Sequence, residues 1–138
     1  MRQDWDAYFI QMAEMVSHRA TCDRLSVGCI LVKDNRIIST GYNGSISEHP
    51  HCDDAGHTMY EGGCKRTIHA ELNALLQCAK FGIPSDGAIA YVTHYPCPDC
   101  MKALNQAGIK KIIYRDFYPH RYVNNFDEGM ELEQWLGV

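Results

Sequence analysis

The most constraining feature of the sequence is a set of three metal-binding side chains divided between two predicted helix starts. His69 lies at the start of one predicted helix, and Cys97 and Cys100 lie at the start of the next. One imidazole and two thiolates form a ligand set suited to tetrahedral zinc, with the fourth position left for water. If all three bind one ion, the two helices must begin side by side. The pattern therefore predicts an adjacent helix pair and a catalytic metal site.

The spacing within each motif supports this interpretation. Cys97 and Cys100 are three residues apart, so they share a helix face, and the positive end of the helix dipole favours their thiolate forms. Glu71 follows His69 by two residues, which is about 200° around an ideal helix. It is therefore poorly placed to be a ligand and well placed to act as a general acid and base beside the metal-activated water.

Each part of the pattern has an ordinary explanation when taken alone. Cys97-Pro98-Asp99-Cys100 between a strand and a helix is equally typical of a thiol redox pair. His69 could be a hydrogen-bonded core residue, and Glu71 could be a solvated acid at a helix start. The joint order of His-x-Glu and then Pro-Cys-x-x-Cys, here beginning at Pro96, is however the signature of zinc deaminases.

Apolar periodicity and turn residues predict the order of the remaining elements. We expect a helix over 4–19, a hairpin of strands 27–32 and 36–39, and a long loop over 44–63. A helix capped by Thr67 ends at Gly82, and its inner stripe would be Leu72, Leu75, Leu76 and Ala79. The final expected elements are a strand over 88–93, a helix from Pro96 to Gly108, a strand over 111–114 and a helix over 128–136.

This order predicts an α/β fold of three layers, α/β/α, with a mixed central sheet and helices on both faces. The length of 138 residues is that of one domain, which we expect to span 1–138. Cys29 and Cys78 lie in apolar stretches and are expected in the core.

Charge and cysteine usage narrow the class of partner. The net charge of -4 and the scattered Lys and Arg residues offer no basic stripe, which favours a small nucleotide over a nucleic acid. There is no run of about 18 apolar residues and no apolar N-terminal leader, so we expect a cytoplasmic protein without a membrane partner. Seven cysteines in such a chain indicate metal or catalytic use rather than disulfides.

The combined motifs resemble the cytidine deaminase superfamily and, within it, the deoxycytidylate deaminases. The resemblance runs from about Cys22 to Tyr118 and is carried by Gly41-Tyr42-Asn43-Gly44, by residues 69–74 (HAELNA) and by residues 96–100 (PCPDC). It implies a cytidine-deaminase-like fold, a catalytic zinc, and hydrolysis of dCMP to dUMP and ammonia, which would supply dUMP for thymidylate synthesis.

The resemblance also implies substrate and effector sites. Asn43 would contact the sugar or phosphate, Tyr118 would contact the substrate, and Arg24 and Ser26 are candidates for the monophosphate. The family is typically a homohexamer, activated by dCTP and inhibited by dTTP near Gly41, Tyr42, Asn43 and Gly44, with Mg²⁺ accompanying the triphosphate. From the residues alone, Asn43-Gly44 could equally be a turn, Tyr118 surface packing and Arg24 a solvated charge.

Some members of the family also hold a structural zinc, and Cys22 and Cys52 match two of its ligands. His57 and Cys64 are our choices for the other two. Three cysteines and one histidine would close a tetrahedron and fasten a long loop that lacks its own core. The alternative is that these cysteines are free thiols and the histidine is solvated.

Other functions remain open at this point, including those of free cytidine deaminases, riboflavin-pathway deaminases and guanine deaminases. A tRNA adenosine deaminase has nearly the same zinc motif, although the acidic balance of this chain disfavours binding to an anticodon arm. A non-catalytic zinc or redox protein would use the same cysteines without releasing ammonia.

Overall fold

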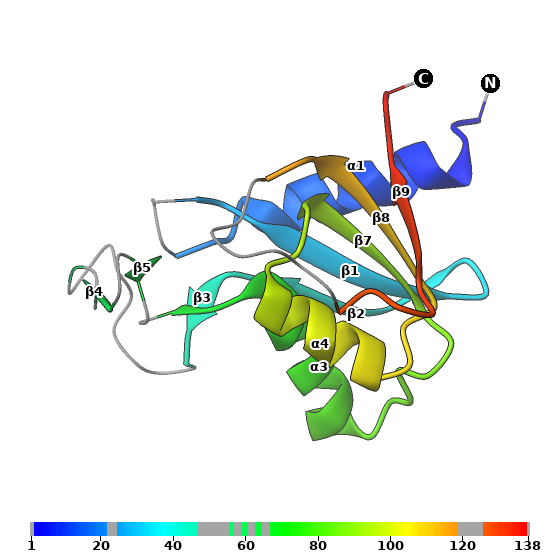
Figure 1. The fold of residues 1–138 in the computed structure, drawn as a ribbon. Helices are drawn as coiled ribbons and strands as arrows, with labels where there is room; N and C mark the ends of the chain where they lie inside the picture. The colour runs from blue at the N-terminus through cyan, green and yellow to red at the C-terminus, as the bar shows by residue number, and fades with distance from the viewer. Residues whose placement is uncertain are drawn as a thin grey trace.

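A five-stranded mixed sheet lies at the centre of the protein, with helices on both of its faces (Figure 1). The computed structural model describes residues 2–21, 25–46, 67–118 and 126–137, together with Gly56, 59–60 and 63–64. The strands of the sheet, in spatial order, are β2 (Arg36–Tyr42), β1 (Gly28–Lys33), β7 (Ile89–His94), β8 (Lys111–Asp116) and β9 (Glu131–Gln134). The helices are α1 (Trp5–Ser17), α3 (Ala70–Phe81) and α4 (Pro98–Gln106).

The direction of the strands changes at the middle of the sheet. β1 is antiparallel to both β2 and β7, whereas β7, β8 and β9 run parallel to one another. Parallel neighbours need crossover connections, and α4 makes the connection between β7 and β8. α1 covers one face, and α3 and α4 cover the other (Figure 1). The predicted three-layer α/β/α fold with a mixed sheet is confirmed.

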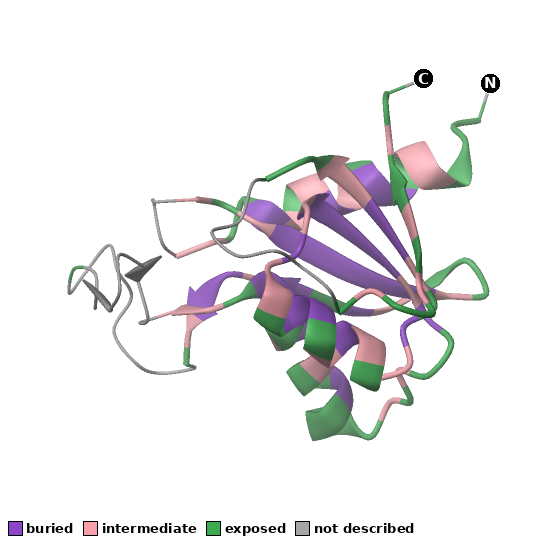
Figure 2. Ribbon diagram, viewed as in Figure 1, coloured by how far each residue is buried: buried purple, intermediate pink, exposed green. Residues whose placement is uncertain are grey.

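Two hydrophobic clusters fill the spaces between the layers, and Figure 2 shows the central strands buried between them. The cluster beneath α1 consists of Phe9, Ile10, Ala13, Ile30, Val32, Tyr91 and Ile113. The cluster beneath α3 and α4 consists of Cys29, Leu31, Ala70, Ala74, Cys78, Ala88, Ala90, Val92, Met101, Leu104, Ile109 and Ile112. Alternate residues of β1 therefore serve opposite cores, as the two-residue period of a strand requires. The prediction that Cys29 and Cys78 are core residues is confirmed.

The turn between β1 and β2 is formed by residues that suit a tight hairpin. Asp34 and Asn35 both have left-handed backbones, with φ of 53° and 59°. Two consecutive residues of this kind suit the right-handed twist of a tight hairpin, and Asp and Asn tolerate that conformation. The predicted hairpin is thus confirmed, although β2 extends further than expected, to Tyr42.

The start and the buried face of α3 differ from the sequence prediction. Thr67 is not its cap, because Thr67 and Ile68 form β6 (Thr67–Ile68), which pairs with β3 (Gly44–Ser45), and the N-cap is His69. The predicted leucine stripe is wrong for Leu72 and Leu76, whereas Leu75 is partly buried and packs against the core. Leu72 and Leu76 are 39% and 44% exposed. The buried residues of the helix are Ala70, Glu71, Ala74 and Cys78.

The reason is that α3 lies unusually close to β2. A Cβ at Gly41 would overlap the carbonyl oxygen of Ala70 and lie 2.5 Å from the backbone nitrogen of Ala74. Only small side chains fit such a contact, so Ala70 and Ala74 face the strand, and Leu72 and Leu76 face outward.

The secondary structure predicted for the C-terminal segment is wrong. The helix expected over 128–136 is instead β9, an edge strand parallel to β8. Leu132 packs against the core below α4 and Trp135 against the core below α1, while Glu131 forms an ion pair of 2.9 Å with Lys111 of β8.

The helix start predicted at Pro96 lies two residues later, because Cys97 is the N-cap of α4 and Pro98 occupies the first turn.

The stretch predicted as a loop over 44–63 contains short strands in its described part. These are β3, β4 (Met59–Tyr60) and β5 (Gly63–Cys64), and β4 pairs with β5.

Among the described residues, none of the helices combines the length and apolarity that crossing a lipid bilayer requires.

Replacement of Gly28 tests the close packing of α1 on the sheet. A Cβ at Gly28 would overlap the carbonyl oxygen of Ala13 and lie 2.7 Å from the backbone nitrogen of Ser17. Gly28→Ala should therefore destabilise the protein by about 1–3 kcal/mol, measured by urea unfolding. Without the clash, a glycine to alanine change in a compatible backbone stabilises by about 0.4–1 kcal/mol.

Gly44→Ala is the control, because its nearest neighbour is a movable side-chain atom of Tyr42 at 3.1 Å. A Gly28→Ala protein as stable as the Gly44→Ala protein would contradict the packing argument.

Candidate active site

The three predicted metal ligands meet where α3 and α4 begin. His69 is the N-cap of α3, Cys97 is the N-cap of α4, and Cys100 lies in the first turn of α4. Nδ1 of His69 is 3.4 Å from Sγ of Cys97 and 3.4 Å from Sγ of Cys100. All three ligand atoms lie within 4.8 Å of one another. The structure thus brings together the side chains that the sequence places on separate helices.

These separations fit a tetrahedral zinc ion. Zinc bonds of about 2.0 Å to nitrogen and about 2.3 Å to sulfur, at tetrahedral angles, place the nitrogen and sulfur about 3.5 Å apart. The observed 3.4 Å matches that edge for both thiols. His69 is exposed and Cys100 is buried, so the donor set lies at the boundary between core and solvent. Three protein ligands leave one position open, as a catalytic site needs.

The surroundings of Cys97 favour its thiolate form, which is the form that binds metal. The hydrogen bond from Cys100 lowers the pKa of Cys97, and a hydrogen bond from His69 acts in the same direction against the cost of burial. The pKa of Cys100 is raised by its bond to Cys97 and by burial. Metal binding requires thiolates, so the lowered pKa of Cys97 favours its role as a ligand.

Glu71 is a buried carboxyl group at this same helix start. It is 5% exposed. Its pKa is raised to about 7, mainly by burial; Cys97 also raises it, whereas the backbone N–H of Glu71 and the charge of His69 lower it. A carboxyl group that changes protonation near neutral pH is suited to move protons during catalysis. Burial raises the pKa of the Cys29 thiol in β1, and the charge of Glu71 acts in the same direction.

Asn43 is bonded to the backbone that follows the undescribed segment 22–24. Its Oδ1 accepts a hydrogen bond of 2.8 Å from the N–H of Val27, and its Nδ2 donates one of 2.6 Å to the carbonyl of Leu25. These bonds fix the exposed Ser26 between them. The substrate contacts predicted for Asn43 and Ser26 stay predictions, and Arg24 lies outside the described residues.

Tyr118 lies just beyond β8, at the same end of the sheet as Cys97. Its ring meets His94 edge-on, with centroids 6.2 Å apart and planes at 86°, and it is 42% exposed. β7 and β8 are parallel, so the chain segments that follow them leave the sheet at one edge. The carboxyl ends of parallel strands are a usual place for ligand sites. The substrate contact predicted for Tyr118 stays a prediction.

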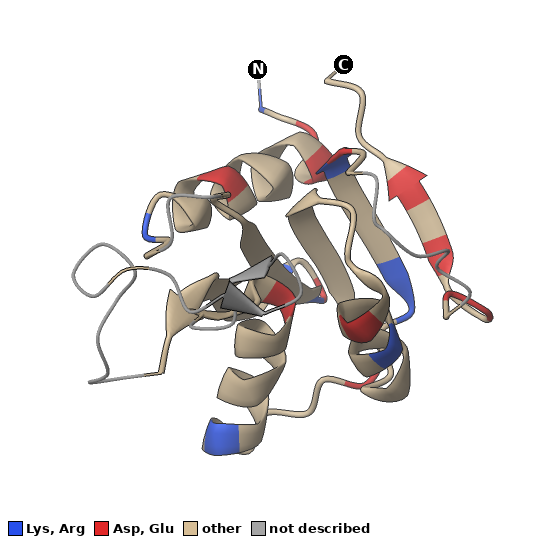
Figure 3. Cartoon of the chain, turned by 60° about the vertical axis from the view of Figure 1, so that its left-hand side comes forward, with Lys and Arg blue, Asp and Glu red and all other residues tan. Residues whose placement is uncertain are grey.

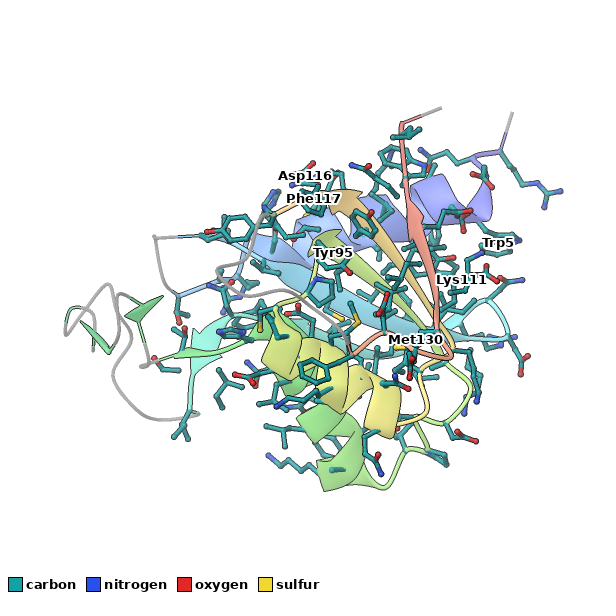
Figure 4. All side chains as sticks on the ribbon, viewed as in Figure 1. Trp5, Tyr95, Lys111, Asp116, Phe117 and Met130 are labelled. Carbon is teal, nitrogen blue, oxygen red and sulfur yellow. The ribbon has the colours of Figure 1, made fainter. Side chains whose placement is uncertain are left out.

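Sequence reasoning missed an aromatic cluster beside the ligands. Tyr95 precedes the Pro96-Cys97 motif, and its ring lies 5.0 Å from that of Tyr114 and 5.6 Å from that of Phe117, between centroids. Figure 4 labels Tyr95 and Phe117, which follow the ends of β7 and β8. The spacing of single aromatic residues on different strands gave no signal of this cluster.

Three of the four residues predicted to bind an effector line a groove between β2 and α3, and the fourth, Asn43, is not in its lining. The groove has a volume of about 340 Å³ and is lined in part by Gly41, Tyr42 and Gly44. The glycine at position 41 also has a packing reason that is independent of effector binding, since α3 lies directly against it. Cys22, Cys52 and His57 of the predicted structural zinc site lie outside the described residues, as does the side chain of Cys64.

Comparison with known proteins agrees with this site. Residues 3–116 match the sequence profile of the cytidine and deoxycytidylate deaminase zinc-binding region. The chain is 50% identical over 136 residues to ComE operon protein 2 of Bacillus subtilis. This alignment covers 96% of this chain and 72% of that protein. It is 36% identical over 147 residues to the deoxycytidylate deaminase of Enterobacteria phage T2, covering 79% of this chain and 78% of that enzyme.

A solved structure shares the whole fold. The dCMP deaminase of cyanophage S-TIM5, crystallised in complex with dCMP and dUMP, superposes with a TM-score of 0.81 at 34% sequence identity. The match covers 98% of this chain and 99% of that one.

The fold and the site together define a metal-dependent hydrolytic enzyme with a buried acid beside a histidine and two cysteines. The chain belongs to the cytidine and deoxycytidylate deaminase family, and its metal is zinc.

Removal of one thiol tests the metal site. Cys97→Ala should lower the zinc content by one ion per chain relative to the unmodified protein, because two ligands hold zinc far less tightly than three. Zinc is measured by elemental mass spectrometry after gel filtration. Cys78→Ala is the control, since Cys78 is a buried thiol of α3 outside the ligand set. Equal zinc in both variants would exclude Cys97 as a ligand.

Proposed function

We propose that this protein hydrolyses dCMP to dUMP and ammonia. The observation that carries the proposal is the buried carboxyl group of Glu71 beside the His69, Cys97 and Cys100 donor set. The substrate follows from the similarity to the cyanophage enzyme crystallised with dCMP and dUMP, which extends over nearly the full length of both chains. The single-domain organisation predicted for residues 1–138 is part of this proposal.

The mechanism assigns the proton transfers to Glu71. A zinc ion held by His69, Cys97 and Cys100 would supply a water whose pKa is lowered towards about 7. Glu71 takes a proton from this water and delivers it to N3 of the cytosine, which makes C4 electrophilic. The oxygen of the deprotonated water bonds to C4, and Glu71 next takes the remaining proton from this oxygen and delivers it to the exocyclic amine. The C4–N4 bond then breaks, so that one water is consumed and one ammonia leaves. The pKa of about 7 lets Glu71 both accept and donate the proton.

The charge distribution disfavours a nucleic-acid substrate. The net charge is -4, and the Lys and Arg residues in helices and strands are spread over β1, β2, α3, α4 and β8 (Figure 3). Binding of an RNA stem would need a continuous set of cations along its phosphates. A mononucleotide needs only one phosphate contact, so we favour dCMP over the anticodon arm of a tRNA.

Glu71→Gln tests the role of the acid and the class of reaction. The amide keeps the shape of the side chain and cannot carry the proton, so kcat for dCMP should fall by about 10²–10⁴-fold. The zinc content should stay unchanged. Glu133→Gln makes the same chemical change at an exposed position of β9 and should leave both quantities unchanged.

The substrate is tested in the same assay. Ammonia release is measured with dCMP, deoxycytidine, dCTP and an anticodon stem-loop, and we expect release from dCMP alone. Release from the stem-loop would instead identify a tRNA deaminase. Zinc binding without ammonia from any substrate would identify a non-catalytic zinc protein.

We propose further that the protein is a homohexamer regulated by dCTP and dTTP, with Mg²⁺, and that its product feeds thymidylate synthesis. The resemblance to deoxycytidylate deaminases supports this proposal, and the groove between β2 and α3 offers a location. Its described lining residues include no Lys or Arg, so the charge of a triphosphate would have to be balanced by Mg²⁺ or by another subunit.

We also propose a second, structural zinc bound by Cys22, Cys52, His57 and Cys64. The ligand types and the need to fasten a long segment support it. The purified protein should contain two zinc ions per chain, and Cys52→Ala should lose one of them without loss of the other. A zinc content of one ion per chain in the unmodified protein would reject the second site.

A further inference from the structure

We propose that Asn73 is a positioning residue that holds the peptide unit preceding His69 and thereby fixes this zinc ligand. Asn73 lies in the first turns of α3, on the side that faces the end of β2. Its side chain touches none of the three ligands by any described bond. Its influence on the metal would therefore pass through the backbone.

The side-chain amide of Asn73 joins two strands. Its Nδ2 donates a hydrogen bond of 2.8 Å to the carbonyl of Tyr42, at the end of β2, and one of 3.4 Å to the carbonyl of Ile68, in β6. An amide NH₂ group has two donors, and both are used here. Because both partners are carbonyl oxygens, the orientation of the amide group is determined.

The second of these bonds acts directly on the ligand. The carbonyl of Ile68 belongs to the same rigid peptide plane as the N–H of His69. Holding that plane fixes the point from which the His69 side chain leaves the backbone. The backbone N–H of Asn73 also donates to the carbonyl of His69 at 2.9 Å. Asn73 therefore holds both peptide units that flank His69.

Another described bond between β2 and α3 lies further from the ligands. Ser39 Oγ donates a bond of 2.7 Å to the carbonyl of Ala74, which also fastens β2 to α3, but it reaches no residue next to a ligand. His69 itself is exposed, so packing around its side chain is limited on the solvent side. Groups that orient a metal ligand typically contribute about 10- to 100-fold to metal affinity or activity.

Asn73→Asp is the most informative change. The carboxylate has nearly the same shape, but a negative oxygen would take the place of Nδ2 and face the carbonyl oxygens of Tyr42 and Ile68. As a charge near the start of α3 it is otherwise favourable to the helix. We therefore expect zinc to transfer to a chromogenic chelator about 10- to 100-fold faster than from the unmodified protein. Asn73→Ala, which removes the donors and adds no repulsion, should show a smaller acceleration.

Two control variants separate positioning from other effects. Gln77→Glu introduces the same charge one turn further along α3, in the same groove. Ser39→Ala removes a bond between the same two elements away from the ligand. Both should release zinc within about twofold of the unmodified rate, with unfolding by urea recorded for every variant. Equal acceleration by Ser39→Ala or Gln77→Glu would overturn the proposal, as would unchanged release from both Asn73 variants.

The kinetic part of the test rests on the proposed dCMP deamination. With zinc held at saturation, Asn73→Asp should lower kcat about tenfold and leave KM for dCMP within about twofold, because the reacting centre is displaced while the nucleotide contacts remain. An unchanged kcat at saturating zinc would reject the positioning role in catalysis. Faster zinc release in a protein that is inactive on dCMP would reject the function and leave the positioning role standing.

Discussion

The short distance between β2 and α3 is the constraint on which the site depends. Gly41 has no side chain, so the backbone of α3 can lie directly against the strand, and Ala70 and Ala74 fill what space remains. Glu71 lies on this inner side of the helix and is carried into the protein. Its raised proton affinity is therefore a result of strand and helix packing as much as of its own neighbours.

The sequence predicted the chemistry better than the packing. His69, Cys97 and Cys100 could be recognised because short motifs at helix starts fix local geometry, and two such motifs imply a shared ion. The layers of the fold also followed from the order of elements. The leucines of α3 were assigned to the core because periodicity identifies an apolar face without showing how close the neighbouring strand lies. Leu72 and Leu76 consequently face outward.

Tertiary contacts decided the features that sequence could not show. The segment of β9 has mixed polar and apolar residues that fit a helix, and its pairing with Lys111 and the neighbouring residues of β8 makes it an edge strand. In the same way Asn43 suggests a turn or a ligand contact by its type, whereas its described bonds hold Leu25 and Val27. Contacts between residues that are distant in the sequence cannot be predicted from the spacing of neighbouring residues.

The burial of Glu71 has a consequence for protein design. The ligand residues and the acid occupy only a few positions, which makes them look easy to transplant onto any pair of adjacent helices. On a scaffold whose helix stands at an ordinary distance from its sheet, the acid would be solvated and ionised at neutral pH. Such a graft would capture zinc and perform little proton transfer. The glycine of the strand and the alanines of the helix would have to be transplanted with it.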